Sequence, residues 1–174
     1  MKNINININY HKTPIGEVII GSYDGKLCML DFRYRKKRDT IDNRIQTTLK
    51  ATYKEYEDDI IRQTKIQLQE YFNMTRKVFE IPLLLVGSTF QKSVWNELLK
   101  IPYGTTASYL ELSKNIGNEK AVRAVANANG ANAIGIIVPC HRIIGSNGKL
   151  TGYAGGLDKK KKLLELENNL FTNL

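Results

Sequence analysis

The sequence predicts an α+β protein in which a small antiparallel sheet with one helix comes first and a mostly helical half follows. Isoleucine and asparagine alternate over residues 4–9, which is the two-residue period of a half-buried strand. After residue 88, apolar residues recur at helical spacing and are divided by serines, glycines and a proline. Gly87-Ser88 reads as a linker between the two patterns, so we expect domains of residues 1–87 and 88–174.

The elements expected in the first half follow from period and turn chemistry. The expected strands are residues 4–10, 16–23 and 27–32, and Asp24-Gly25 is a hairpin turn signal between the last two. Apolar side chains at helical spacing predict a helix over about residues 58–72, and residues 78–86 predict a further strand. The basic run 33–38 breaks the apolar pattern. We interpret it as a solvated loop, with a nucleic-acid patch as the alternative.

Caps and glycines place three helices in the second half. Ser88 or Thr89 can open a helix, which the Pro-Tyr-Gly of residues 102–104 ends. Ser108 opens a short helix, and Gly117-Asn118 turns the chain into another helix over residues 119–129. Two short helices joined by a glycine-containing turn are typical of a helix-turn-helix, although such a pair often serves packing alone.

Residues 138–142, Val-Pro-Cys-His-Arg, contain a potential nucleophile beside a potential proton acceptor. The thiolate is the reactive form of cysteine, and a neighbouring histidine can lower the pKa of a thiol from about 8.5 to neutrality or below. Cys140 is therefore a candidate nucleophile and His141 a candidate base. The alternative is a buried, inert cysteine, because free cysteine is among the most buried residue types.

Further motifs surround this pair in a definite order. Ile-Pro-Tyr-Gly at 101–104, Ser-Tyr at 108–109 and Asn-Glu-Lys-Ala-Val-Arg-Ala-Val at 118–125 precede it, and Thr-Gly-Tyr-Ala-Gly-Gly-Leu at 151–157 follows. In this order and spacing the set closely resembles the O6-alkylguanine-DNA alkyltransferases, also called methylated-DNA-protein-cysteine methyltransferases. The resemblance covers residues 90–167, approximately the second half of the chain.

The resemblance implies a ribonuclease H-like first domain and a winged helix-turn-helix-like second domain. It also implies direct-reversal DNA repair by a methylated-DNA-protein-cysteine S-methyltransferase. The expected substrate is O6-alkylguanine, with O4-alkylthymine as a further candidate, and it must be flipped out of duplex DNA before a sulfur can reach the alkyl carbon. The alkyl group then passes irreversibly to Cys140, so that each molecule acts once.

The same resemblance assigns individual residues. Glu167 is expected to orient His141, and a water is expected to bridge His141 to Cys140, since adjacent side chains of a strand point to opposite faces. Asn132 is expected to brace the turn before the active-site segment, and Arg123 to occupy the place of the flipped nucleotide. The residues expected around the base are Tyr109, Asn132, Val138, Tyr153 and Ala154. The residues expected on DNA are Tyr109, Asn118, Arg123, Ala124, Asn127 and Ser146.

Local composition adds detail to these assignments. Alanines keep the helix over residues 119–129 slim, and a slim helix with one long side chain, Arg123, suits close approach to a minor groove. The alternative is an alanine-rich helix with a solvated arginine. Ala154 stands where some family members have serine, and Gly135 where some have proline, so the pocket can differ from theirs in hydrogen bonding and width.

Composition and charge set the wider expectations. The chain has 26 Lys and Arg against 17 Asp and Glu, a net charge of +9, which favours a polyanionic partner. Two cysteines without a secretory leader favour the cytoplasm, and no apolar run reaches membrane-spanning length. Too few His and Cys residues are present for a structural zinc site, so we expect no metal and no cofactor. The expected partner is double-stranded alkylated DNA, bound through the minor groove by a monomer.

Three other function classes remain open from the sequence. A catalytically silent lesion-binding relative would share the helix-turn-helix but lack the cysteine, and Cys140 counts against it. A transcription factor would need no buried thiol. A cysteine hydrolase would need an oxyanion hole, and no familiar hydrolase motif surrounds Cys140.

Overall fold

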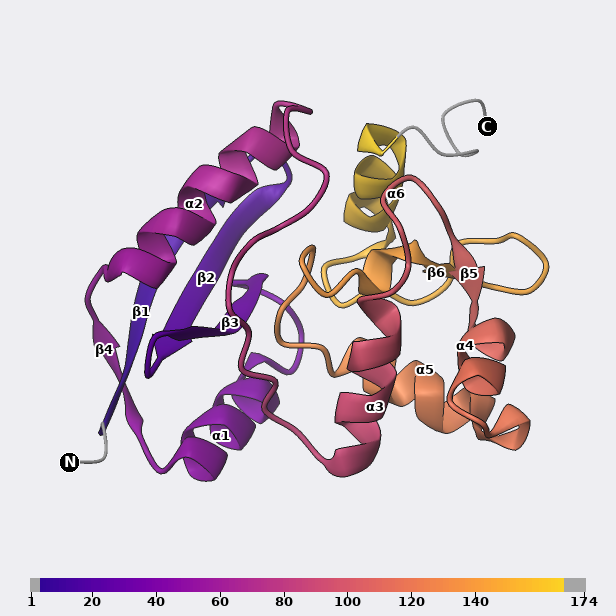
Figure 1. Ribbon diagram of the computed structural model, residues 1–174, viewed down its shortest axis with the longest axis horizontal. Coiled ribbons are helices and arrows are strands. Elements are labelled where there is room, and N and C mark those ends of the chain that lie inside the picture. Colours follow the sequence, from indigo (N-terminus) through magenta and orange to yellow (C-terminus); the bar gives the residue numbers. More distant parts are fainter. Residues whose placement is uncertain (1–3, 168–174) are drawn as a thin grey trace. The chain divides into compact units, whose positions relative to one another are not determined.

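The computed structural model describes residues 4–167 of the chain. Its contacts divide the chain into two compact units, Met1–Gly87 and Ser88–Leu174. The first unit contains the sheet and two helices, and the second contains mainly helices and loops (Figure 1). The α+β class predicted from the sequence is therefore confirmed.

A four-stranded sheet forms the centre of the first unit. Its strands are β1 (Asn5–Thr13), β2 (Gly16–Tyr23), β3 (Lys26–Phe32) and β4 (Thr52–Glu55). Their order is β3-β2-β1-β4, and both β1-β2 and β2-β3 are antiparallel, as hairpin turns require. The edge strand β4 pairs with β1 in parallel. The three predicted strands are antiparallel, as expected, but the sheet is mixed, because β4, which was not predicted, returns through a helix instead of a hairpin.

The core of this unit lies around strands β2 and β3. Residues 18–22 and 27–32 are buried without interruption, so both faces of β2 and β3 are shielded from solvent. Helix α2 (Asp59–Phe72) runs along the sheet and contacts β1, β2 and β3 (Figure 1). It buries Ile61, Leu68 and Tyr71 against the strands. This helix was predicted to within one residue, and Asp58 is its N-cap.

Two features of the first unit differ from the sequence prediction. The basic run 33–38 is not simply a solvated loop, because its arginines form ion pairs with acidic side chains, among them the buried Asp31. Arg35 donates to Asp31 at 3.0 Å with only 7% of its side chain exposed, and Arg38 bonds both Asp31 and Asp42. Residues 78–86 form no strand, and only an isolated parallel bridge joins Leu83 to Leu27.

Helix α1 (Arg38–Leu49) and β4 were not predicted at all. Ile41 and Ile45 are the buried residues of α1, and the rest of its length is mostly polar. The helix also begins after Lys37 in a left-handed conformation, φ 60°, with no side-chain cap. The usual start signal of a helix is therefore missing from the sequence.

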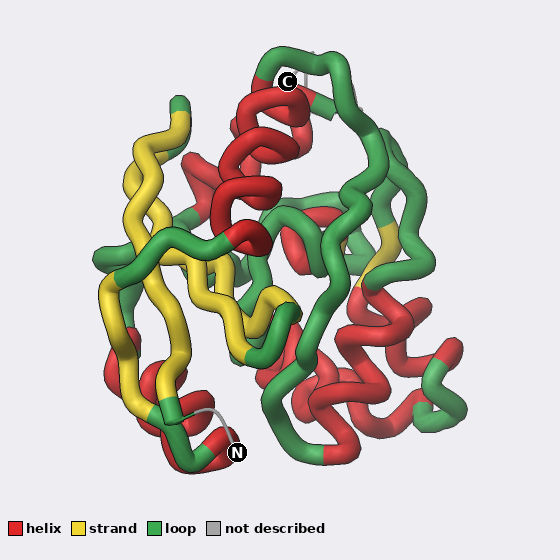
Figure 2. The backbone as a smooth tube through the Cα atoms, turned by 60° about the vertical axis from the view of Figure 1, so that its left-hand side comes forward, coloured by secondary structure: helices red, strands yellow, loops and turns green. Residues whose placement is uncertain are grey.

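The second unit is built of short helices joined by long loops, as Figure 2 shows. Its helices are α3 (Thr89–Leu98), α4 (Tyr109–Asn115), α5 (Val122–Gly130) and α6 (Leu157–Leu166), with 3-10 turns η1 (Glu119–Ala121) and η2 (Cys140–Arg142). Two short strands, β5 (Ala107–Ser108) and β6 (Ile143–Ile144), pair in parallel. Ser88 and Ser108 each close a capping box at the start of a helix, so both predicted helix starts are confirmed.

Helices α3, α4 and α5 share one core. Trp95 of α3 is 2% exposed, and its indole N–H donates to the carbonyl of Ala128 in α5 at 2.8 Å. Val94, Leu98, Leu112 and Val125 are buried with it. The α4-turn-α5 arrangement is the predicted helix-turn-helix, with the second helix entered through η1.

Asp58 offers a test of how the first unit is held together. Its carboxylate accepts hydrogen bonds from the backbone N–H of Ile61 at 2.9 Å, from Asn7 at 2.8 Å and from Ser22. We expect Asp58→Ala to lower the free energy of unfolding by about 1–3 kcal/mol at neutral pH. Denaturant titration measures this loss.

The loss should depend on pH in a defined direction. Burial raises the pKa of Asp58, but hydrogen bonds from Ser22 and Asn7 outweigh it and hold the pKa below its usual value. The stabilisation is thus complete above the unfolded pKa, near 3.9, and disappears as pH falls through the lower folded value. Asp59→Ala is the matched control, since 87% of that side chain is exposed. Equal losses in the two variants would show that the Asp58 network contributes nothing.

Candidate active site and nucleic-acid interface

Cys140 lies in a tight turn that buries it. Its exposed fraction is 5%, and η2 continues from it through Arg142. The preceding residues bend sharply, with Ile136 in the left-handed region at φ 68°, a conformation that is strained for a β-branched side chain. Asn132 holds this bend: its side-chain oxygen accepts from Ile134 N at 2.9 Å, and its amide donates to Val138 O at 2.8 Å. These contacts are what a bracing residue would make.

His141 is completely buried and bonded to Glu167. The distance from His141 Nε2 to Glu167 Oε1 is 2.9 Å, and both side chains are 0% exposed. The other ring nitrogen, Nδ1, has no hydrogen-bond partner within the described part of the chain. A glutamate oxygen at Nε2 selects the tautomer with its proton there, so Nδ1 carries a free lone pair.

Arg142 completes the setting of Glu167. Its Nε and one terminal nitrogen each donate to a different oxygen of the Glu167 carboxylate at 2.9 Å, and its other terminal nitrogen donates to Ile101 O at 2.7 Å. The N–H of Gly104 approaches the same carboxylate at 3.4 Å. The turn at Cys140, the loop at residues 101–104 and the end of α6 are thus joined at one carboxylate.

The charge states of this group follow from its burial and its bonds. Burial by itself raises the pKa of Glu167, but hydrogen bonds from His141 and Arg142 outweigh it and hold that pKa far below its usual value. Burial lowers the pKa of His141, and Glu167 compensates only in part. At neutral pH the pair is therefore a carboxylate and a neutral imidazole, which is the form of histidine that can accept a proton.

The turn geometry corrects one expectation. Cys140 and His141 were expected on opposite faces of a strand, whereas the structure places them in a 3-10 turn. In such a turn neighbouring side chains are about 120° apart, because there are about three residues per turn. The two side chains still point in different directions.

A buried lysine lies next to this turn. Lys160 of α6 is 0% exposed and donates to the carbonyls of Ile143, Thr151 and Gly152, the last two at 2.8 and 3.1 Å. Tyr109 donates to the same Thr151 carbonyl at 3.0 Å. Burial lowers the pKa of Lys160 to about 8, and the charge of Cys140 raises it in part. The ammonium therefore fastens the chain after β6 to α6.

The other residues expected around the base lie on two neighbouring segments. Val138 is fully buried two residues before Cys140. Tyr153 and Ala154 are half-buried in the loop between β6 and α6, in a turn that Gly156 N closes onto Tyr153 O at 3.0 Å. Gly156 has φ 99°, a value that favours glycine at this position.

Five of the six residues expected on DNA are exposed, and the sixth, Tyr109, is half-buried. Three of the exposed residues lie on one face of α5, because Asn127 follows Arg123 by four residues and Ala124 by three. Asn118 is exposed in the turn before η1, and Ser146 is exposed in the loop after β6.

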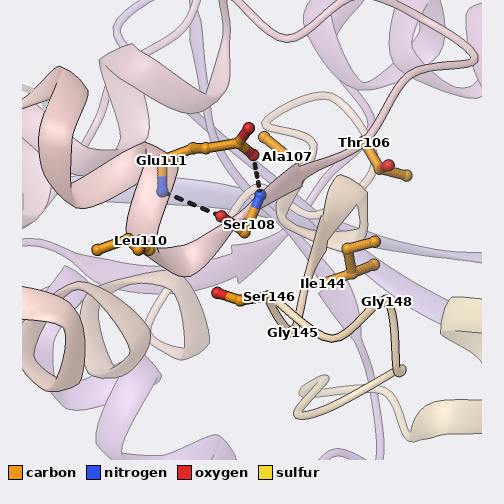
Figure 3. Close-up of a pocket in the computed structure, with 9 residues that line it drawn as sticks. All are labelled: Thr106, Ala107, Ser108, Leu110, Glu111, Ile144, Gly145, Ser146 and Gly148. Atoms are coloured by element: carbon orange, nitrogen blue, oxygen red, sulfur yellow. Dashed lines mark hydrogen bonds between the residues drawn. The ribbon is translucent and has the colours of Figure 1, made fainter.

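A hollow of about 460 Å³ lies beside the start of α4 and the loop after β6 (Figure 3). Figure 3 shows Ser108 and Glu111 bonded to each other in the capping box, with Ser146 and Gly145 on the other side. Ser146 is the one residue of those expected on DNA that lines this hollow.

Within residues 4–167, no group of three or more His, Cys, Asp or Glu side chains could hold a metal ion. None of the helices described there is long and apolar enough to cross a membrane.

Family models match both units. A model described as 6-O-methylguanine DNA methyltransferase, DNA binding domain, matches residues 89–169, and one described as the ribonuclease-like domain of the same protein matches residues 6–85. A unit that contains a helix-turn-helix together with a buried cysteine, histidine and glutamate agrees with the first of these. The chain belongs to the 6-O-methylguanine DNA methyltransferase family and contains both of its domains.

Individual relatives are similar over most of the chain. The methylated-DNA–protein-cysteine methyltransferase of Methanosarcina acetivorans is 45% identical over 91% of this chain and 96% of its own length. The constitutive enzyme of that name from Bacillus subtilis is 41% identical over 90% of this chain and 93% of its own. The Mycobacterium tuberculosis OGT solved in complex with DNA has a TM-score of 0.79 and 38% identity, covering 94% of this chain and 92% of that one.

Sequence reasoning missed three residues of the site. Arg142 was quoted in the motif but given no partner, although an arginine next to a predicted His-Glu pair is a signal for a buried carboxylate. Lys160 is hidden in a run of four lysines, where nothing marks the one that turns inward. Asn129 lies at the end of a helix, where asparagine is ordinary, and only the structure shows it buried beside Cys140.

Replacing Arg142 with lysine should weaken the group around Glu167 while keeping a positive charge. Lysine cannot donate two parallel bonds to the carboxylate, so we expect the free energy of unfolding to fall by about 2–4 kcal/mol. Alkyl transfer should also slow, because His141 loses its oriented partner. Raising pH from about 7 to about 9 should restore part of the rate by ionising the thiol directly.

The matched control is Arg62→Lys, in an ion pair whose arginine side chain is 55% exposed. Its effect on stability should stay below about 0.5 kcal/mol. Denaturant unfolding and single-turnover kinetics measure the two properties. Wild-type stability in Arg142→Lys would mean that the two-point bond to Glu167 is not important for the fold.

Proposed function

We propose that this protein repairs O6-methylguanine in DNA by transferring the methyl group to its own Cys140. The observation that carries the proposal is the buried turn in which Cys140 is followed by a neutral His141 bonded to Glu167. This arrangement lies in the unit that matches the family's DNA-binding domain. Transfer of other alkyl groups and activity on O4-alkylthymine are finer parts of the same proposal.

The chemistry begins with a proton transfer from the thiol. The proton leaves Cys140 Sγ through a bridging water to Nδ1 of His141, and Glu167 stabilises the imidazolium that forms. The free lone pair of Nδ1 supports this direction of transfer. The thiolate then attacks the methyl carbon, the S–C bond forms and the bond from carbon to O6 breaks. The electron pair stays on guanine, which takes up one proton, and Tyr109 is a candidate to assist it.

The lesion must leave the base stack before the sulfur can align behind the methyl carbon, at a cost of a few kcal/mol. Arg123, exposed on α5 among small alanines, is the side chain that would occupy the vacated place. Asn118, Ala124, Asn127 and Ser146 would contact the backbone on either side. Minor-groove binding to double-stranded DNA fits the slim helix and the net charge of +9.

The product is a thioether, whose carbon is a poor electrophile, so we propose a single turnover for each molecule. Action as a monomer, without cofactor and in the cytoplasm, completes the proposal. Neither Cys28 nor Cys140 forms a disulfide, which fits a reducing compartment.

Replacing Cys140 with serine should abolish transfer and leave DNA affinity nearly unchanged, because binding depends on the helix and phosphate contacts. The measurement mixes protein with duplex containing O6-methylguanine and records the intact mass. Wild type should gain one methyl group on the peptide containing Cys140, and Cys140→Ser should gain none. Tight binding of the lesion by wild type without a mass change would instead support a silent lesion reader.

Arg123→Ala should affect repair of duplex DNA much more than reaction with free O6-benzylguanine. The free base needs no flipping and meets the same Cys140, so the contrast separates flipping from chemistry. We expect a loss of about tenfold or more on duplex, which corresponds to about 1.4 kcal/mol of lost stabilisation, and a small change on the free base. Arg123→Lys should restore only part, since lysine lacks the planar guanidinium.

Lys92→Ala, which removes a charge from the exposed side of α3, is the control for lost electrostatic attraction. Its effect on duplex repair should be much smaller than that of Arg123→Ala. Equal fractional losses on duplex and free base for Arg123→Ala would show that this residue supports the fold or the thiol instead.

A further inference from the structure

Asn129 is a buried polar residue next to the candidate nucleophile that the mechanism above does not use. It lies in the last turn of α5 with 5% of its surface exposed. Its side-chain Nδ2 donates to the carbonyl of Cys140 at 3.4 Å. The side chain also interacts with the hydroxyl of Tyr109 and lowers the pKa of that group, against the larger effect of burial. Asn129 is therefore placed between Cys140 and Tyr109.

One half of this amide is unused. Asn129 Oδ1 is buried and has no hydrogen-bond partner among residues 4–167. The bond to Cys140 sets the orientation of the Asn129 amide, because the opposite orientation would bring Oδ1 against the carbonyl oxygen of Cys140. Asn132, three residues later, bonds through both ends of its amide. A buried acceptor without a donor costs free energy, so such a group calls for an explanation.

The chemistry of the substrate supplies a donor for this acceptor. Alkylation at O6 removes the hydrogen from N1 of guanine, so the exocyclic 2-amino group carries the remaining N–H bonds of the base. Alkylation at O4 of thymine removes the hydrogen from N3, and that base then has no N–H donor. An acceptor beside the thiol can therefore distinguish the two lesions by a hydrogen bond.

We propose that Oδ1 of Asn129 accepts a hydrogen bond from the 2-amino group of the flipped base and makes Asn129 a specificity-determining residue for alkylguanine. The inference rests on the proposed function, since the base must lie against Cys140 for transfer. A site built around a hydrogen-bonding group rejects analogues that lack the matching group, because its buried atom is then left without a partner. The bond to the Cys140 carbonyl places the amide against the backbone of the residue that carries the nucleophile.

The test compares two duplexes that differ only in this amine, one with O6-methylguanine and one with O6-methylhypoxanthine. Single-turnover transfer to Cys140 is measured by mass for each. For wild type we expect the loss of the amine to slow transfer by about tenfold, the effect of about one hydrogen bond. Equal rates on the two duplexes would overturn the inference without the need for any variant. Absence of transfer from both duplexes would instead contradict the proposed function.

Asn129→Leu then removes the acceptor and keeps a side chain of similar size. The ratio of rates, guanine over hypoxanthine, should fall by about threefold or more toward unity. The preference for O6-methylguanine over O4-methylthymine should narrow with it. A ratio that changes less than this would show that Asn129 serves only to hold the Cys140 turn.

Ser113→Ala is the matched control, because Ser113 is another buried polar residue of this unit and donates to the backbone carbonyl of Tyr109 at 2.8 Å. It should alter the rates on both duplexes equally and leave their ratio as in wild type. Any purely structural disturbance of the site behaves in the same way. A changed ratio in Asn129→Leu with an unchanged ratio in Ser113→Ala therefore identifies recognition of the amine.

Discussion

The arrangement of the second unit depends on the burial of one carboxylate. Glu167 is 2% exposed, and its charge is stable there only because Arg142 and His141 donate to it directly. Arg142 in turn bonds Ile101, so three chain segments separated by loops meet at this point. The same carboxylate selects the histidine tautomer whose free nitrogen is available to the thiol. Structural and chemical requirements are therefore met by the same set of bonds.

Lys160 stabilises the chain that follows the Cys140 turn. Its ammonium uses its three donors on three backbone carbonyls, which matches the full donor capacity of the group. A buried cation bonded only to neutral groups is costly, and its pKa of about 8 reflects that cost. The neighbouring Cys140 offsets the cost when it becomes a thiolate. Cation and nucleophile thus stabilise one another in the charged form.

Much of the fold could be predicted from local patterns. The strands β1, β2 and β3 and the helices α2, α3, α4 and α5 were found because period, caps and turn residues agree at each of them. Helix α1 could not be found, since it has two buried residues and an uncapped start at Lys37. The parallel pairing of β4 could not be predicted for another reason. It depends on the position at which the chain emerges from α1, and no local sequence pattern indicates that position.

The residues of the candidate site also fall into two groups, those that the sequence predicted and those that it did not. Cys140, His141 and Glu167 were predicted from motif and resemblance, and the structure brings the last two into contact at 2.9 Å. The 3-10 turn at Cys140 was not predicted, because an apolar run before a Pro-Cys-His sequence reads as a strand. Lys160 and Asn129 could not be singled out, since burial of one lysine in four, or of one asparagine at a helix end, is decided by tertiary packing.

The loop-to-helix bonds around Glu167 also bear on when the thiol becomes reactive during folding. Cys140 and His141 are adjacent in the chain, yet the group that orients His141 is 26 residues away and reaches it only after α6 has packed. In a chain in which α6 has not packed, His141 therefore lacks the carboxylate that orients it. The proton acceptor proposed for Cys140 is thus complete only when α6 has packed against the turn, and the adjacent Cys-His pair does not supply it by itself.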